Sequence, residues 1–286
     1  DQCGKNVTLV NTEQSSMCGI IAYIGHREAT PILIEGLKRL EYRGYDSAGL
    51  ATVDNSGEKP VLDVVRAVGR VRVLEEAIER SGGVSGSLGI AHTRWATHGG
   101  VTEANAHPHL DDSKSGHHIS IIHNGIIENY TSLKTWLIER GHEFTSETDT
   151  EVLSHLIGEL YKGDLEKAVQ AALKEVTGAY AIAAICAKEP DVMVVARKGS
   201  PLMVGVGKDE YVVASDQCAI VAHTNQAFTL EDYTVAKLTR DSFRTSTIDD
   251  VEVTPEIREL EVQIEQIERG GFEHYMLKEI YEQPSA

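Results

Sequence analysis

Short apolar runs and helical stripes alternate along the chain and predict a layered α+β fold. Residues 18–24 form an apolar run typical of a buried strand, and Thr30 with Pro31 marks a helix start as N-cap and first helical residue. Apolar residues at helical spacing give this helix one buried face: Ile32, Leu33, Leu37 and Leu40.

The middle of the chain continues this mixture. Helical patterns follow at about 68–79, before Gly141, after Thr148 and after Asp164. Thr148 and Glu151 have capping-box spacing, and Asp164 is predicted to cap the next helix. Strand patterns lie at 47–53, 88–92 and 118–122.

From residue 179 onward the pattern changes to short β-rich runs separated by turn signals, which predicts antiparallel strands. These runs are 179–187, 192–197, 202–206, 211–214 and 233–238. From Pro255 charge rises and the pattern weakens, so this tail is predicted to be an exposed connector.

Composition narrows the function classes. The 286 residues are 41% hydrophobic, enough for a real core, and 27 basic against 44 acidic side chains give a formal charge of −17. This charge argues against nucleic acid or anionic membranes as partners. No apolar run reaches the ~18 residues of a membrane span. The cysteines at 3, 18, 186 and 218 form no disulfide framework, so we expect a cytoplasmic protein.

Cys18 stands at the start of the first apolar run and follows Met17. A cysteine in such a place is more often a small buried hydrophobe. Removal of the methionine would instead leave Cys18 with a free α-amine. The thiol could then be a nucleophile, and its own amine, with a reference pKa of about 7.7–8.0, could be the base.

Amide cleavage also needs donors for an oxyanion. Asn124 and Gly125 follow an apolar strand and can supply a side-chain amide and a backbone N–H. Asn-Gly more commonly forms a hairpin turn, so this motif alone is weak.

A glutamine substrate further needs groups for its charged end. Arg94 is the best candidate for the α-carboxylate, because a guanidinium can bind both oxygens. Asp149 is the best candidate for the α-ammonium. The alternatives are a surface arginine stacked on Trp95 and an aspartate that only stabilises a helix N-terminus.

Taken together, these segments resemble the glutaminase domain of the glutamine:fructose-6-phosphate aminotransferases, which are class II glutamine amidotransferases. The resemblance runs from about residue 17 to the end of the chain, in family order. The matching segments are 18–20, 40–49, 93–99, 105–109, 123–129, 146–151, 214–216 and 274–284.

The resemblance implies a four-layer αββα sandwich of the N-terminal nucleophile hydrolase type. It implies that Cys18 attacks the glutamine amide to form a thioester, with Asn124 and Gly125 as oxyanion hole. Arg94 and Asp149 would hold the substrate's charged groups.

Five further residues enter the predicted site through the resemblance alone. Three would belong to a flap over glutamine: Trp95, Thr97 and His98. Arg43 and His107 match family positions near the site or the domain interface.

The inferred chemistry needs no cofactor and no metal. The middle of the chain is rich in histidine: His107, His109, His117, His118 and His123. No acidic or cysteine ligand pattern accompanies them, so we expect no metal there.

The resemblance also suggests a division of the chain. Residues 1–17 are expected to be a leader, either a propeptide or an artefactual extension, removed or disordered. Residues 18–255 would be the glutaminase domain, and 256–286 a linker towards a sugar-phosphate isomerase domain absent from this sequence. That covalently linked domain, through which the family would form a homodimer, would bind fructose 6-phosphate.

Two alternatives remain open. With residues 1–17 retained, Cys18 has no α-amine, and the chain would be a glutamine-binding module. The second alternative keeps the chemistry but assigns the domain to another class II amidotransferase.

Overall fold

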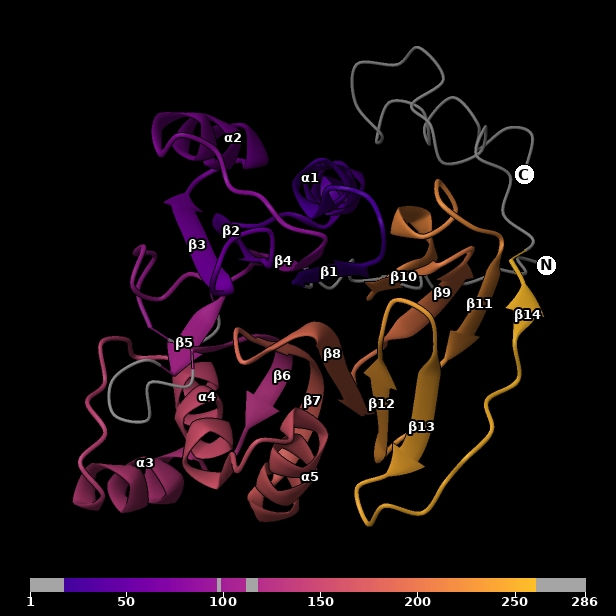
Figure 1. Cartoon of the computed structure of the whole chain (residues 1–286). Coiled ribbons are helices and arrows are strands. Elements are labelled where there is room, and N and C mark those ends of the chain that lie inside the picture. Colours follow the sequence, from indigo (N-terminus) through magenta and orange to yellow (C-terminus); the bar gives the residue numbers. More distant parts are fainter. Residues whose placement is uncertain (1–17, 97–98, 112–117, 261–286) are drawn as a thin grey trace, which may run out of the picture.

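Two antiparallel β-sheets packed face to face form the centre of the molecule, as the computed structural model shows for residues 18–96, 99–111 and 118–260 (Figure 1). The first sheet has the spatial order β14 (Arg258–Glu259), β11 (Gln226–Thr229), β9 (Met203–Gly207), β10 (Glu210–Ala214), β1 (Gly19–Ile24), β4 (Leu88–Arg94), β2 (Ser47–Asp54) and β3 (Val61–Val68). The second has the order β13 (Phe243–Thr247), β12 (Thr234–Leu238), β8 (Glu189–Lys198), β7 (Gly178–Cys186), β6 (Ile119–Ile127) and β5 (His109–Asp111).

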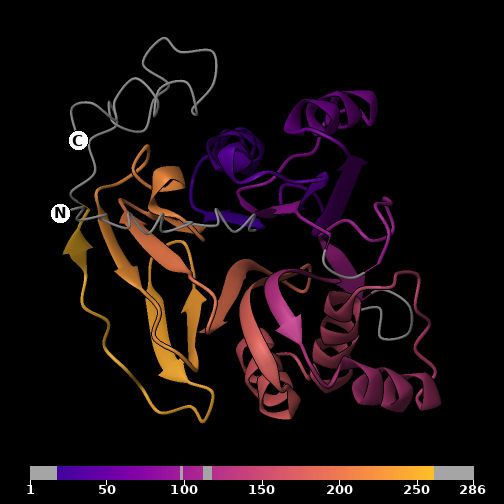
Figure 2. The ribbon, with the colours of Figure 1, turned by 180° about the vertical axis from the view of Figure 1, so that it is seen from behind.

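Helices cover the outer face of each sheet. The first sheet is covered by α1 (Ala29–Leu40) and α2 (Val71–Arg80). The second is covered by α3 (Tyr130–Glu139), α4 (Asp149–Leu160) and α5 (Leu165–Glu175). Both views show helices, sheet, sheet and helices in succession (Figures 1 and 2). The predicted four-layer αββα sandwich is therefore confirmed.

Strand alternation assigns each apolar side chain to one of three cores. On β1, Ile20, Ala22 and Ile24 pack between the sheets, whereas Ile21 and Tyr23 pack against the helices on the other face. The inter-sheet core also includes alternate residues of β7, and a third core lies between the second sheet and its helices. Because β1 is buried on both faces, it reads in the sequence as a continuous apolar run.

Several local predictions need correction. The first helix begins at Ala29 with Glu28 as N-cap, and Thr30 donates its hydroxyl hydrogen to Val84 O instead of capping. The segment before the second helix is a strand, β3, which sequence patterning missed because its residues are only half-buried. Asn124 and Gly125 lie inside β6 and not in a hairpin turn.

The two predicted N-caps of the later helices are confirmed. Thr148 Oγ1 accepts from the backbone N–H of Glu151, and Asp164 Oδ1 accepts from that of Lys167. The Glu151 carboxylate does not close the capping box on Thr148; it accepts hydrogen bonds from Thr145 and Ser146. This folds the preceding loop over the start of α4.

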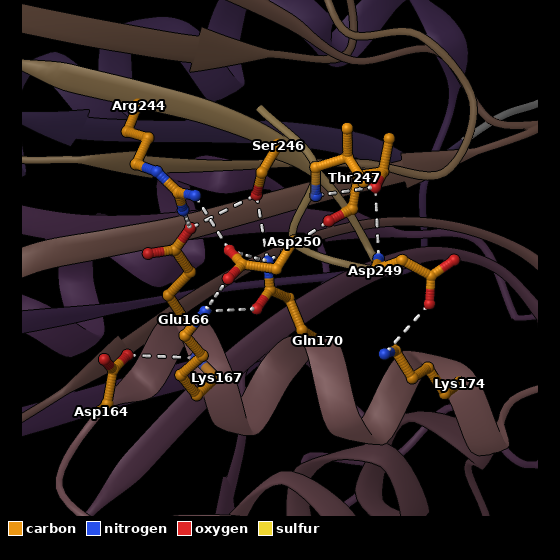
Figure 3. A network of polar contacts seen from close by, with 11 residues as sticks. Asp164, Glu166, Lys167, Gln170, Lys174, Arg244, Ser246, Thr247, Asp249 and Asp250 are labelled. Atoms are coloured by element: carbon orange, nitrogen blue, oxygen red, sulfur yellow. Dashed lines mark hydrogen bonds and ion pairs between the residues drawn. The ribbon is translucent and has the colours of Figure 1, made fainter. Parts of the chain in front are cut away.

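A polar network fastens α5 to β13 and the turn after it (Figure 3). Arg244 bridges Glu166 and Asp250 at 2.6 and 2.9 Å, and Lys167 lies 2.5 Å from Asp250. Gln170, from the next turn of the helix, donates to Ser246. These three donors lower the pKa of the Asp250 carboxyl, chiefly through hydrogen bonds from Lys167 and Arg244. The network holds the outer helix in register with the sheet edge.

Among the described residues, no helix is long and apolar enough to span a membrane. The segment after Pro255 contributes β14, whose Arg258 and Glu259 pair with β11 at the sheet edge. The division of the chain at residue 255 stays a prediction.

Gly158 provides a test of the packing between α4 and β5. Alanine normally stabilises a helix relative to glycine by up to ~1 kcal/mol. A Cβ at Gly158 would lie 1.8 Å from Asp111 Oδ2, so we expect Gly158→Ala instead to lower the free energy of unfolding by about 1–3 kcal/mol. Urea unfolding measures this.

Gly57→Ala is the matched control, because the nearest atom to a Cβ added at this position would be 3.8 Å away. It should change stability little. An equally small effect at Gly158 would contradict the described packing.

Candidate active site

Cys18 immediately precedes β1, beside the end of the neighbouring strand β4 in the first sheet. Gly19 pairs with Thr93 of β4, and its N–H donates to the Thr93 hydroxyl at 3.1 Å. The Trp95 N–H in turn points at Cys18 Sγ, with 3.2 Å between nitrogen and sulfur. The β1–β4 register thus brings the thiol beside the Arg94-Trp95 segment.

Strand alternation places three polar groups on the same inter-sheet face. Leu88 and Ile90 of β4 pack between the sheets, so His92 and Arg94 continue that face. On β6, Ile122 packs between the sheets and Asn124 follows two residues later. The polar residues therefore cap the apolar inter-sheet core at one end.

Asn124 connects the two sheets at this end. Its Nδ2 donates to Cys18 O at 2.9 Å, and its Oδ1 lies 2.8 Å from His92 Nε2. An amide oxygen only accepts, so His92 carries its proton on Nε2. His92 is fully buried and fixes the orientation of the Asn124 amide.

Gly125 has a backbone conformation that disfavours other residues. Its φ is +139°, and a Cβ there would lie 2.1 Å from Ala179 O of the neighbouring strand. Glycine therefore allows β6 and β7 to approach beside the site.

Arg94 and Asp149 supply opposite charges to the same cavity. Arg94 is only 4% exposed, donates to Gly100 O at 3.2 Å and lies 3.9 Å from Asp46. Asp149 is the first residue of α4, and its Oδ2 accepts from the Ile127 N–H at 2.8 Å. The pair is positioned by β4 and by a helix N-terminus, respectively.

A cavity of about 230 Å³ joins these groups. Every predicted site residue that the structure describes lines it: Cys18, Arg43, Arg94, Trp95, His107, Asn124, Gly125 and Asp149. The predicted flap residues Thr97 and His98 lie outside the described residues. Sequence reasoning missed several further lining residues: His123, Ile126, Thr148, Thr150, Ser200 and Pro201.

Arg43 lies in the short helix 41–43, and its side chain lines the cavity. Its guanidinium lies 2.5 Å from Asp216 and 3.4 Å from Ser215 Oγ. Ser215 also accepts from the Ile20 N–H of β1. Arg43 therefore links the end of β10 to the wall of the cavity.

Buried histidines form the floor behind the cavity. His107 Nε2 and His123 Nδ1 lie 2.9 and 3.0 Å from Thr150 Oγ1, and the His92 and His107 rings are 4.2 Å apart. Loss of hydration lowers the pKa of each ring, that of His92 to about 3. All three are therefore neutral at pH 7.

Burial also raises the pKa of the Cys18 thiol, against the opposing effects of the Trp95 N–H and the Arg94 charge. The sulfur is therefore protonated at neutral pH. A nucleophilic role requires a base to accept that proton.

Comparison with known proteins supplies the family. Residues 80–277 match the model of the glutamine amidotransferase domain. The chain belongs to the glutamine amidotransferase domain family.

Relatives of this amidotransferase domain include the isomerizing glutamine–fructose-6-phosphate aminotransferases of Chlorobaculum tepidum, 52% identical, and Thermus thermophilus, 48% identical. Each alignment covers 94% of this chain and 43% of the relative. The chain thus spans less than half the length of these relatives.

Solved structures agree on the fold. Glutamine phosphoribosylpyrophosphate amidotransferase from B. subtilis, complexed with ADP and GMP, is 30% identical with a TM-score of 0.68. A structure described as the allosteric regulatory enzyme of purine biosynthesis is 31% identical with a TM-score of 0.70. Each match covers 81% of this chain and 49% of the other. The sandwich is of the N-terminal nucleophile hydrolase type, as predicted.

The neutral histidines make stability pH-dependent. A histidine with a lowered folded pKa loses stability as pH falls below the unfolded value of about 6.5, towards the folded one. For His92, with a folded pKa of about 3, the loss between pH 7 and pH 5 is about 2 kcal/mol.

We expect His92→Asn to reduce the fall in unfolding free energy between these pH values, as measured by urea titration. His26→Asn, which removes a half-exposed histidine far from this floor, is the control and should keep the wild-type slope. Identical slopes for His92→Asn and wild type would rule out a buried neutral His92.

Proposed function

We propose that this domain hydrolyses the side-chain amide of L-glutamine through a thioester on Cys18. The observation that carries the proposal is the meeting of Cys18, Asn124, Arg94 and Asp149 around one cavity. Membership of the glutamine amidotransferase domain family supports glutamine as the substrate.

The α-amine of Cys18, once it is the first residue, would be the base. The thiol is protonated at neutral pH, and the described groups that hydrogen-bond to its sulfur are the N–H and carbonyl of Trp95. Neither can accept a proton usefully. An amine on the same residue has a reference pKa of about 7.7–8.0 and is held beside the sulfur covalently.

Asn124 and Gly125 would stabilise the oxyanion. The Asn124 amide group has two N–H donors, so its bond to Cys18 O leaves the second for substrate. His92 would act here as a positioning residue, because it holds the Asn124 oxygen and so turns the NH₂ group towards Cys18.

The remaining lining residues would bind and enclose glutamine. Arg94 would hold the α-carboxylate and Asp149 the α-ammonium. Trp95, which is 42% exposed, would form part of a flap with Thr97 and His98 that excludes water. Arg43 and His107 would shape the opposite wall.

The reaction then proceeds in two steps. The Cys18 thiol gives its proton to the α-amine, and sulfur bonds to the amide carbon to form a tetrahedral oxyanion. Collapse breaks the C–N bond, and the protonated amine passes its proton to the leaving nitrogen, which departs as ammonia. Water then attacks the thioester, restoring the thiol and releasing glutamate.

The ammonia would serve the conversion of fructose 6-phosphate to glucosamine 6-phosphate, on a sugar-phosphate isomerase domain linked after residues 256–286. The names of the relatives at 46–52% identity, and their greater length, support this assignment. Dimerisation would occur through that domain.

A phosphoribosylpyrophosphate amidotransferase has the same fold at 30% identity. The second candidate function is therefore delivery of ammonia to an acceptor other than fructose 6-phosphate. Sequence downstream of Ala286 distinguishes the two acceptors. With residues 1–17 retained, the domain would bind glutamine without cleaving it.

Cys18→Ala should reduce release of glutamate from glutamine to the rate without enzyme, because the nucleophile is lost. A coupled glutamate dehydrogenase assay measures this. Cys218→Ala, at a buried cysteine whose thiol bonds to Arg39 O, is the matched control and should retain activity. Unchanged turnover in Cys18→Ala would refute the proposal.

Asn124→Ala should lower kcat by about 10²–10³-fold, as expected for loss of one oxyanion donor, with a smaller effect on KM. The control Asn225→Ala removes an exposed amide that bonds to Glu259 and should change neither constant. A rise in KM alone would instead make Asn124 a substrate-binding residue.

A further inference from the structure

A buried group of two histidines and an aspartate lies on the far side of the second sheet from the inter-sheet core. Asp111 ends the edge strand β5, His142 lies in the loop between α3 and α4, and His155 lies on α4. Their side chains are 0%, 0% and 3% exposed. One ligand atom from each lies within 4.8 Å of the others.

His142 is only partly paired within this group. Its Nε2 lies 3.0 Å from Glu159 Oε2, and a carboxylate only accepts, so the ring proton is on Nε2. The lone pair on Nδ1 then has no hydrogen-bond partner among the described residues. It faces Asp111 Oδ1, another acceptor, at 3.7 Å. Two buried acceptors facing each other are unfavourable unless a donor or a cation lies between them.

His155 has a matching arrangement. Its Nδ1 lies 2.8 Å from Asp111 Oδ1, so without an ion Nδ1 carries the ring proton and donates it to Asp111. Its buried Nε2 has no hydrogen-bond partner in the described part of the chain. Glu151 Oε1 lies 3.9 Å from that Nε2. If Nδ1 bound a cation, the ring proton would sit on Nε2 and face Glu151.

Each imidazole thus has a carboxylate behind it and Asp111 in front. This is the arrangement of histidines that bind metals, where the outer carboxylate fixes the tautomer. Three carboxylates surround the two rings, from Asp111, Glu151 and Glu159, and Arg140 lies 3.8 Å from Glu159 on the outer side.

We propose that Asp111, His142 and His155 bind one divalent transition-metal ion of the Zn²⁺ class. Two imidazole nitrogens and one carboxylate oxygen suit this class, and water would complete a tetrahedron. Bond lengths of about 2.0–2.2 Å require ligand atoms about 3.4 Å apart. Binding must therefore move His142 Nδ1 inward from its 3.7 Å distance to Asp111 Oδ1, and must separate His155 Nδ1 from the same oxygen, which lies 2.8 Å away. His142 lies in a loop and can move inward.

The ion would have a structural role, separate from glutamine hydrolysis. It would fasten the edge strand β5 and the α3–α4 loop to α4, whose first residues line the candidate active site. Sequence reasoning considered other histidines for metal binding. It missed this set because its members are 31 and 13 residues apart and share no motif.

The test uses the purified chain, stripped with a chelator and reloaded with Zn²⁺ or Co²⁺. We expect one retained ion per chain by elemental mass spectrometry after gel filtration, and a higher melting temperature. Bound Co²⁺ should show the visible bands of a tetrahedral site without thiolate-to-metal charge transfer. That absence separates this site from binding at Cys18.

His142→Gln and Asp111→Asn should each abolish retention, and Glu159→Ala should lower the affinity about 10–100-fold. His26→Gln, at a half-exposed histidine, should bind as wild type does. Each variant is judged by the change in its own melting temperature when metal is added, so a less stable variant remains informative.

Three results would overturn the proposal. Wild type could retain no more metal than His142→Gln, or bound Co²⁺ could show a thiolate band. Nitrogen NMR at pH 7 could find both ring nitrogens of His142 protonated in the metal-free wild type, and added Zn²⁺ could leave these signals unchanged. In that last case a proton, not an ion, would separate His142 from Asp111.

Discussion

The packing of two antiparallel sheets across an apolar core is the constraint on which the site depends. Alternate residues of β1, β4 and β6 fill that core, so polar residues that continue the same alternation along or just before these strands must face the same side. Cys18, Arg94 and Asn124 are these residues. A shift of one residue in the β1–β4 register would turn Arg94 out of the cavity.

Desolvation determines the charge states around the cavity. It keeps the histidine floor neutral and raises the pKa of the Cys18 thiol. The buried charges that remain are Arg94 and Asp149, each held by backbone groups. Arg43 also lines the cavity, where it is paired with Asp216. Arg94 and Asp149 thus present a fixed cation and a fixed anion, which suits a substrate with an α-carboxylate and an α-ammonium.

Much of this could be predicted from the sequence, for identifiable reasons. The apolar run of β1 and the caps at Thr148 and Asp164 are local signals, and they were confirmed. Five strands were missed: β3 is only half-buried, and β5, β11, β13 and β14 have two to five residues each. The helix start at Thr30 was wrong, because the Thr30 hydroxyl bonds to Val84, 54 residues away.

Part of the candidate site could also be predicted from the sequence, and part could not. Residue chemistry made Cys18, Arg94, Asn124, Gly125 and Asp149 candidates, and the resemblance gave them roles. The resemblance alone added Arg43, Trp95 and His107, whereas the partners behind all of them depend on tertiary structure. His92 stands two residues before Arg94, a spacing that places both on one strand face, yet only the packing of β6 against β4 shows that it holds Asn124. Ser200 and Pro201 reach the cavity from a loop that carries no motif.

The central claim is that Cys18 supplies both the attacking sulfur and the amine that takes its proton. Intact-mass spectrometry of the purified protein, together with its glutaminase rate, tests this most directly. We expect active molecules to begin at Cys18 and molecules still bonded to Met17 to be inactive. Full activity in protein that retains this peptide bond would contradict it.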